Sequence, residues 1–231
     1  MARSEGNGRP VGGLRRLLDA PQPQSTVDLR RFLQPKERPQ PGEVCEMCAE
    51  PIGDEHSHVV NMETRTLSCV DRACYLLFTH EGAAAGKFKA VPDRRIHDPG
   101  FALTDIQWEA LQIPVGIAFF FENSQMGHSV AFYPSPAGAT ESLLPLDTWS
   151  EVVAANPMLQ TMEADVEALL VYRPKHGGMH AFLVPIDVCY ELVGHIRRDW
   201  KGFDGGEKAW TAINAFFDRL AERARPWKTP A

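Results

Sequence analysis

The spacing of the cysteines constrains this chain more than any other feature of its sequence. Two residues separate Cys45 from Cys48, four separate Cys69 from Cys74, and twenty residues lie between the two pairs. Two close thiol pairs at this separation can converge on one tetrahedral metal ion. The sequence therefore predicts a four-cysteine metal-binding module over residues 43–81, of the zinc-ribbon or treble-clef type.

The segment between the two cysteine pairs predicts how they come together. Two extended runs, 58–62 and 65–69, flank a polar break, which is typical of a hairpin that returns Cys69 to the first pair. Asp71 is a suitable N-cap for a short helix over 72–79, whose first turn carries Cys74. His56 and His58 could replace one cysteine as a ligand, but we expect them on the surface of the hairpin.

Zinc is the expected ion, because four thiolates close its coordination sphere and leave no position for water or substrate. Ligand type alone does not separate zinc from iron, so a rubredoxin-like iron or a [2Fe–2S] cluster is an alternative. A further alternative is a redox-active pair of thiols that binds no metal. A module of this size has little core of its own, so metal binding is expected to contribute much of its folding free energy.

Charge and cysteine count narrow the class of protein. The formal net charge is −6 with a pI near 5.8, which argues against a chain built to neutralise nucleic-acid phosphates. Five cysteines, four of them grouped as ligands, suit a reducing compartment better than a disulfide framework. No apolar run reaches the length of a membrane span, the longest candidate being 113–121. We expect a cytoplasmic protein without a membrane span.

The rest of the chain divides into a mobile N-terminal arm, 1–42, and a body over 87–225, which a Gly/Ala-rich hinge connects to the module. In the body, apolar runs predict strands, and amphipathic periodicity with caps predicts helices. The expected strands are 88–92, 114–121, 129–133, 167–172 and 181–185, and the expected helices 104–111, 147–155, 187–200 and 207–223. Strands in neighbouring pairs, with helices mainly at the C-terminal end, indicate an α+β fold with an antiparallel sheet.

Residues that could support catalysis are few. The Pro/Gly-rich segment 133–142, expected to be an ordered loop, carries Ser135, Thr140 and Glu141, and a turn runs from His176 to His180. No nucleophile, base and orienting group can be paired from the sequence, and no GxGxxG, P-loop, GxSxG or HExxH motif occurs. Cys189 lies on the apolar stripe of a predicted helix and is expected to be a small buried residue. The sequence therefore favours a protein that is not an enzyme.

Three stretches carry a resemblance to a known family. They are CEMCAEPIGDEHSHVVNMETRTLSC, IPVGIAFFFENS followed by AFYPSPAGATESLLPLD, and LVPIDVCYELVGHIRRDWKGF. Over residues 43–222 the chain resembles an uncharacterised, mainly actinobacterial family whose genes lie beside those of actinobacterial-type uptake [NiFe]-hydrogenases. The resemblance implies an accessory role in the maturation, assembly or electron coupling of a hydrogenase, with a hydrogenase subunit or maturation factor as partner.

Three hypotheses of different classes follow. An accessory protein with a structural metal module, acting by protein–protein interaction, needs no catalytic residues. An iron-binding electron carrier needs the four thiolates to hold iron, and its colour would separate it from a zinc protein. An enzyme needs a site near the 133–142 loop, with that loop and the His176 to His180 turn meeting in one pocket.

Overall fold

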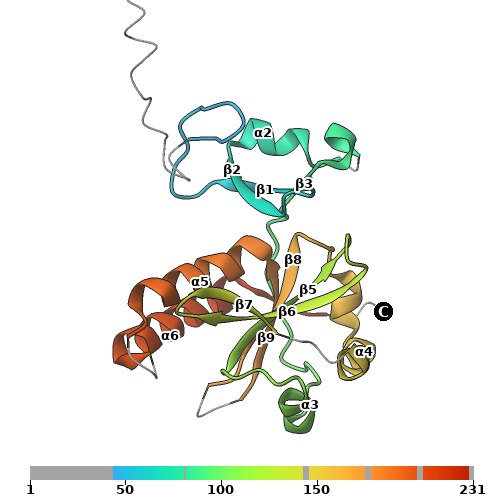
Figure 1. The fold of residues 1–231 in the computed structure, drawn as a ribbon, viewed down its shortest axis with the longest axis vertical. Coiled ribbons are helices and arrows are strands. Elements are labelled where there is room, and N and C mark those ends of the chain that lie inside the picture. Colours follow the sequence, from blue (N-terminus) through green and yellow to red (C-terminus); the bar gives the residue numbers. More distant parts are fainter. Residues whose placement is uncertain (1–43, 81, 143–145, 175–177, 202–204, 229–231) are drawn as a thin grey trace, which may run out of the picture. The chain divides into compact units, whose positions relative to one another are not determined.

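The computed structural model describes residues 44–80, 82–142, 146–174, 178–201 and 205–228. The chain divides into two units, 1–38 and 39–231, and every described residue belongs to the second. Its architecture is mixed α+β, with two largely antiparallel sheets and helices at the C-terminal end, as expected (Figure 1). The predicted arm, 1–42, lies outside the described residues, and the predicted division into 43–81 and 87–225 stays a prediction.

A three-stranded sheet forms the part of the chain that carries the cysteine pairs. Strands β1 (Ser57–Asn61) and β2 (Thr66–Val70) make the predicted hairpin, one residue out of step with the expected bounds. Strand β3 (Phe88–Ala90), within the expected strand 88–92, pairs with the other side of β1 and so belongs to this sheet. Helix α2 (Arg72–Leu77) follows β2 directly, and the 3-10 helix η2 (Ala83–Gly86) precedes β3.

A seven-stranded sheet forms the body, with the order β10-β4-β9-β8-β5-β6-β7. All neighbours are antiparallel except β10 and β4. The apolar run 114–121 contributes most of β5, which lies between β8 and β6, where its near-continuous apolar side chains are covered on both faces. The strands are β4 (Ile96–His97), β5 (Ile117–Asn123), β6 (His128–Ser135), β7 (Gly138–Ser142), β8 (Glu167–Tyr172), β9 (His180–Pro185) and β10 (Arg225–Pro226).

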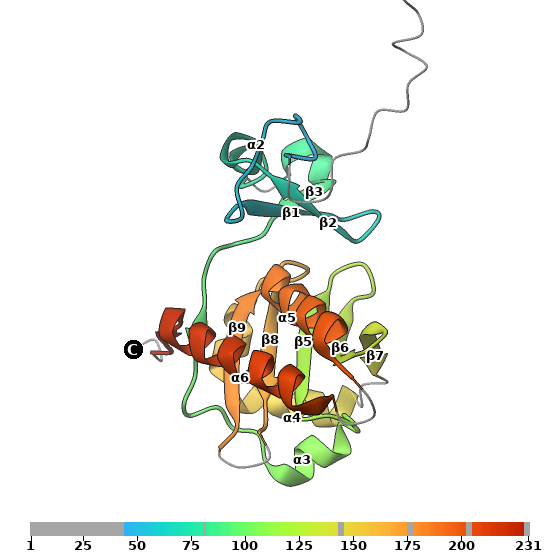
Figure 2. The same ribbon diagram turned by 90° about the vertical axis from the view of Figure 1, so that its left-hand side faces the viewer.

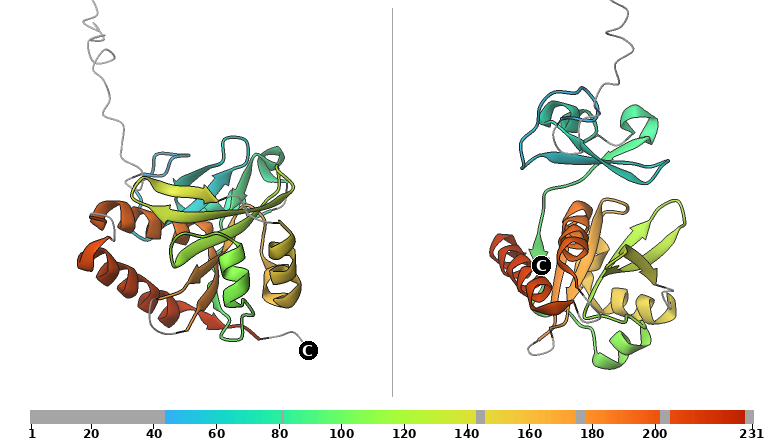
Figure 3. Two further views of the ribbon diagram at one scale, coloured as in Figure 1. Left: turned by 60° about the horizontal axis from the view of Figure 1, so that its bottom comes forward. Right: turned by 60° about the vertical axis from the view of Figure 1, so that its left-hand side comes forward.

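Helices cover both faces of the seven-stranded sheet (Figure 2; Figure 3, right). Helices α5 (Ile186–Asp199) and α6 (Gly206–Arg223) pack on one face, in a core that includes Phe119 and Phe182. Helices α3 (Asp105–Ala110) and α4 (Leu146–Ala155) and the 3-10 helix η3 (Pro157–Thr161) pack on the other. Successive side chains of a strand point to opposite faces, so each central strand contributes to both cores.

Local sequence signals account for the ends of several helices. Thr104 and Gln107 form a capping box at the start of α3. In α5 and α6, Cys189, Leu192, Ile196, Ile213 and Phe217 are buried, as the helical periodicity predicts, and Trp210 is half-buried against the same core. No helix in the described ranges combines the length and the apolar content that crossing a membrane requires.

The expectation of an irregular loop over 134–142 is wrong. Strand β6 runs to Ser135 and pairs with β7 from Gly138, leaving a two-residue turn between them. Gly138 has a φ of +128°, which few other residues adopt, and Ser135 Oγ donates to its carbonyl oxygen. The Pro and Gly content that indicated a loop therefore belongs to a tight hairpin.

Candidate metal centre

The first cysteine pair lies on a tight backbone knuckle. Cys45 N–H donates to the Glu50 carbonyl oxygen at 2.8 Å, and Ala49 N–H donates to the Cys45 carbonyl oxygen at the same distance. Ala49 closes the knuckle with a φ of +65°. Glu46 N–H donates to the Cys69 carbonyl oxygen at 2.9 Å, so the knuckle is held against strand β2. The predicted return of the hairpin to the first cysteine pair is thus present in the backbone.

Asp71 begins helix α2 and faces the knuckle. Its Oδ1 accepts from the backbone N–H groups of Ala73 and Cys74, at 2.7 and 3.0 Å, which confirms the predicted N-cap. Its Oδ2 accepts from the Cys48 thiol at 2.8 Å. One carboxylate therefore fixes the helix end and contacts a cysteine of the knuckle.

Four side chains converge at this point. One ligand atom each from Cys45, Cys48, Asp71 and Cys74 all lie within 4.8 Å of one another. Sulfurs bound to one tetrahedral zinc at roughly 2.3 Å would be about 3.8 Å apart. Three thiols and a carboxylate at this separation therefore fit a four-coordinate ion of the zinc type.

The close contacts among these four side chains shift their pKa values. Hydrogen bonds from the thiols of Cys48 and Cys45 hold the pKa of the Asp71 carboxyl well below its usual range. The Asp71 carboxylate in turn raises the pKa of the Cys48 thiol, and burial raises that of Cys74. Without an ion the Cys48 and Cys74 thiols therefore keep protons that metal binding would displace, whereas the pKa of the Cys45 thiol is lowered.

Cys69 is grouped differently. Its Sγ lies within 4.8 Å of ring nitrogens of His56 and His58, in a cluster that shares no residue with the first. The pleat of the hairpin explains this. Val59 and Val70 lie on one face of the hairpin and pack with Cys45, whereas Cys69 and its partner in the strand pair, His58, lie on the other face. The prediction that Cys45, Cys48, Cys69 and Cys74 bind one ion stays a prediction.

Sequence reasoning assigned Asp71 only a capping role and missed its place beside the thiols. A signal was present, because Asp71 precedes Cys74 by the same x2 spacing that separates Cys45 from Cys48. A knuckle pair and a pair on the first turn of a helix can then supply four ligands to one ion.

The other predicted candidates are not brought together. Ser135 and Thr140 hydrogen-bond each other at 3.0 Å within the β6–β7 hairpin. His180 packs beside the ring of His97, and His176 lies outside the described residues. Cys189 is fully buried, and burial raises the pKa of its thiol, as expected of an unreactive core residue.

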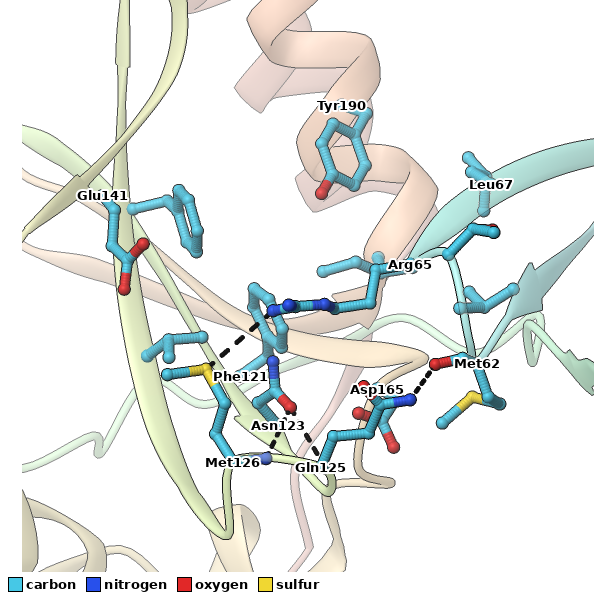
Figure 4. A pocket seen from close by; sticks show the side chains of 15 residues that line it. Met62, Arg65, Leu67, Phe121, Asn123, Gln125, Met126, Glu141, Asp165 and Tyr190 are labelled. Carbon is cyan, nitrogen blue, oxygen red and sulfur yellow. Dashed lines mark hydrogen bonds between the residues drawn. The ribbon is translucent and has the colours of Figure 1, made fainter. Parts of the chain in front are cut away.

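Glu141 lines a pocket of about 420 Å³, which contains no residue of the 178–180 turn (Figure 4). Its apolar wall includes Phe121 and Tyr190, and Arg65, from the turn between β1 and β2, extends across it towards Met126. Asn123 orders the loop below, because its Oδ1 accepts from the backbone N–H groups of two following residues. The pocket combines an apolar wall with charges of both signs and could hold a small amphipathic molecule.

Comparison with known proteins gives a family but no activity. Over residues 44–224 the chain matches the model of a family of unknown function, DUF5947. No curated protein and no solved structure matches the chain.

Proposed function

The chain belongs to this family of unknown function, and we propose that it is a metal-binding accessory protein that acts by contacting a protein partner. The observation that carries the proposal is the convergence of Cys45, Cys48 and Cys74 with Asp71. We assign zinc as the ion, held by these three thiolates with the Asp71 carboxylate as fourth ligand, in a treble-clef-like module.

The ligand set favours a structural role for the ion. Four protein ligands close the coordination sphere of zinc and leave no position for a water molecule. Binding of the ion then contributes to the folding free energy of the module. The cluster joins the knuckle to the first turn of α2 and thereby connects two segments that share only a small core around Val59 and Val70. Metal binding would hold these segments in one arrangement and so preserve the surface that they present.

Exposed apolar side chains on this surface support a partner. Helix α2 contains no buried residue, and its Leu76 and Leu77 are 49% and 66% exposed. Met47, on the knuckle, is also exposed. Large apolar side chains in contact with water are a common feature of protein interaction sites.

The identity of the partner rests on the sequence resemblance. It suggests a hydrogenase subunit or a maturation factor, and the net charge of −6 argues against nucleic acid as the partner. In this proposal the protein assists the assembly, maturation or coupling of a [NiFe]-hydrogenase through contact, without turnover of its own.

Metal analysis of the purified protein tests the first part of the proposal. We expect zinc without visible absorption, and we expect Cys48→Ser to lose one equivalent of it and to loosen the module. Visible absorption from bound iron would instead favour the electron-carrier alternative. A Cys48→Ser variant that keeps its full zinc content would contradict the assignment of this site.

Pull-down from a strain that makes the hydrogenase tests the second part. The wild-type protein should recover a hydrogenase subunit or maturation factor, and both Cys48→Ser and Leu77→Ser should recover less. Ile106→Ser is the matched control, because Ile106 is 82% exposed but lies on α3 in the body. Normal hydrogen uptake after gene deletion, with no complex recovered, would disprove the accessory role.

A further inference from the structure

A second group of metal-ligand side chains lies on the β1–β2 hairpin. One ring nitrogen each from His56 and His58 and the Sγ of Cys69 lie within 4.8 Å of one another. The ring centroids of the two histidines are 4.7 Å apart. Imidazole and thiolate together are ligands that zinc and related transition metals prefer.

Strand geometry explains why these three side chains meet. His58 and Cys69 are directly opposite each other in the antiparallel pair of β1 and β2. Side chains opposite each other in such a pair lie on the same face of the sheet, with Cβ atoms about 5 Å apart. His56 precedes His58 by two residues, and side chains two residues apart in an extended chain lie on the same face.

Hydrogen bonding orients the first histidine for metal binding. His56 Nδ1 lies 2.8 Å from the Gly53 carbonyl oxygen, which can only accept, so Nδ1 carries the proton and Nε2 the lone pair. His56 Nε2 is buried and has no hydrogen-bond partner among the described residues. A buried acceptor without a partner is costly, and a bound ion would satisfy it.

A carboxylate stands behind the second histidine. His58 Nδ1 lies 2.8 Å from Asp187 Oδ2, and Asp187 Oδ1 is held by the backbone N–H of Val188 at 2.9 Å. Metal-bound histidines commonly place their other ring nitrogen against a carboxylate or carbonyl oxygen, which fixes the ring and strengthens the ligand. His56 shows this arrangement with the Gly53 carbonyl oxygen, whereas His58 Nδ1 lies close to the Asp187 carboxylate without a hydrogen bond between them.

We propose that His56, His58 and Cys69 form a second metal site, separate from the first, for a divalent transition metal of the zinc type. Three protein ligands leave a fourth position for water or an added ligand. Both histidines line a polar cleft of about 630 Å³, which gives that position access to solvent. The ion at this site is therefore exchangeable, in contrast to the ion held by four protein ligands.

Metal stoichiometry of the full chain tests the proposal. The wild-type protein, reconstituted with Zn²⁺, should bind two equivalents. Cys69→Ser and the double variant His56→Gln/His58→Gln should each bind one, and a chelator should remove the second ion from wild-type protein first. His80→Gln is the matched control, because His80 lies in the same segment but outside both clusters, and it should bind two.

The absorption spectrum of bound Co²⁺ can distinguish the two sites in the wild-type protein. Co²⁺ at the first site should give a thiolate charge-transfer band from three sulfurs, and the second equivalent should add about one third as much from a single sulfur. Cys48→Ser should weaken the first signal and keep the second, so failure of one site is distinguishable from failure of the other. A single equivalent in wild-type protein, or loss of the first-site signal in Cys69→Ser, would overturn the proposal.

Discussion

Asp71 links helix formation to the chemistry of the cysteines in a single side chain. One carboxylate oxygen caps α2, and the other accepts from the Cys48 thiol. The two roles make different demands, because a cap needs only an oxygen acceptor, whereas a metal ligand gains from negative charge. Substitutions that keep one property and remove the other can therefore separate the roles.

Asp71→Asn should weaken zinc binding at least about tenfold and leave the stability of the metal-free protein nearly unchanged, because Asn caps helices as well as Asp. Asp71→Ala should weaken binding and also cost about 1 kcal/mol of metal-free stability through the lost cap. Competition with a chromogenic chelator and thermal unfolding measure the two effects.

Asp54→Asn is the control for the change of charge, because Asp54 is an exposed acid of the same segment and belongs to neither cluster. It should bind zinc as the wild type does. Wild-type zinc affinity in Asp71→Asn would show that Asp71 acts only as a cap.

The sequence predicted which residues are close at this centre better than it predicted their grouping. Cysteine spacing and the cap signal are local, and both are reflected in the knuckle and in α2. The face on which Cys69 lies depends on strand register, and a shift of one residue reverses it. The expected runs, 58–62 and 65–69, already place His58 opposite Cys69, but the cysteine spacing assigned Cys69 to the other thiols.

At the scale of elements, long periodic segments were predicted well. Helices α5 and α6 differ from the expected bounds by one residue at their ends, because an apolar stripe repeated over several turns leaves little choice of register. The β6–β7 hairpin was missed, because Pro and Gly mark turns and edge strands alike. The two-residue strands β4 and β10 have no local signal, since only distant chain segments define them.

Gly205 lies at the junction between α5 and α6, in a backbone conformation and packing that favour glycine. It has a φ of +87°, and a Cβ there would lie 2.9 Å from Cε3 of the Trp200 ring. Gly205→Ala should therefore cost about 1–3 kcal/mol, from backbone strain and displacement of the indole. Urea unfolding followed by circular dichroism measures the loss.

Gly194→Ala provides the opposite case in the neighbouring helix. Gly194 lies inside α5 with ordinary φ, and a Cβ there would meet nothing within 4 Å in the described structure. This substitution should stabilise the protein by about 0.5–1 kcal/mol, because Ala favours helix more than Gly does. Equal effects of the two substitutions would mean that the junction at Gly205 imposes no constraint.

At the scale of the whole described chain, one ion pair connects the segment after β3 to the centre of the large sheet. Arg94 donates to both carboxylate oxygens of Glu167, at 2.5 and 2.6 Å, and its guanidinium also donates to the Thr161 carbonyl oxygen. The Glu167 side chain is fully buried at the start of β8, whereas that of Arg94 is 41% exposed. The Glu167 carboxylate raises the pKa of the Arg94 guanidinium, which therefore stays charged.

Composition and periodicity predicted the α+β class, but long-range contacts of this kind have no signature in a single sequence. Arg94 lies outside every predicted strand and helix, and Glu167 was expected only as the first residue of a strand, with 72 residues between them. Their pairing depends on strand order, which no local pattern specifies. The class of the fold could therefore be predicted, and the contacts that connect its parts could not.

Arg94→Met should lower the free energy of unfolding by about 2 kcal/mol, because it leaves the Glu167 carboxylate buried with its charge uncompensated. Arg94 is partly exposed, so the loss should be smaller than for a fully buried ion pair. The double variant Arg94→Met/Glu167→Met should be more stable than Arg94→Met alone, since it removes the stranded charge. Lys87→Met, which breaks an exposed pair with Glu63, is the control and should change stability by less than about 1 kcal/mol. Urea unfolding at low and high salt measures all three, and a double variant as unstable as the sum of its single variants would show that the two side chains stabilise the chain independently.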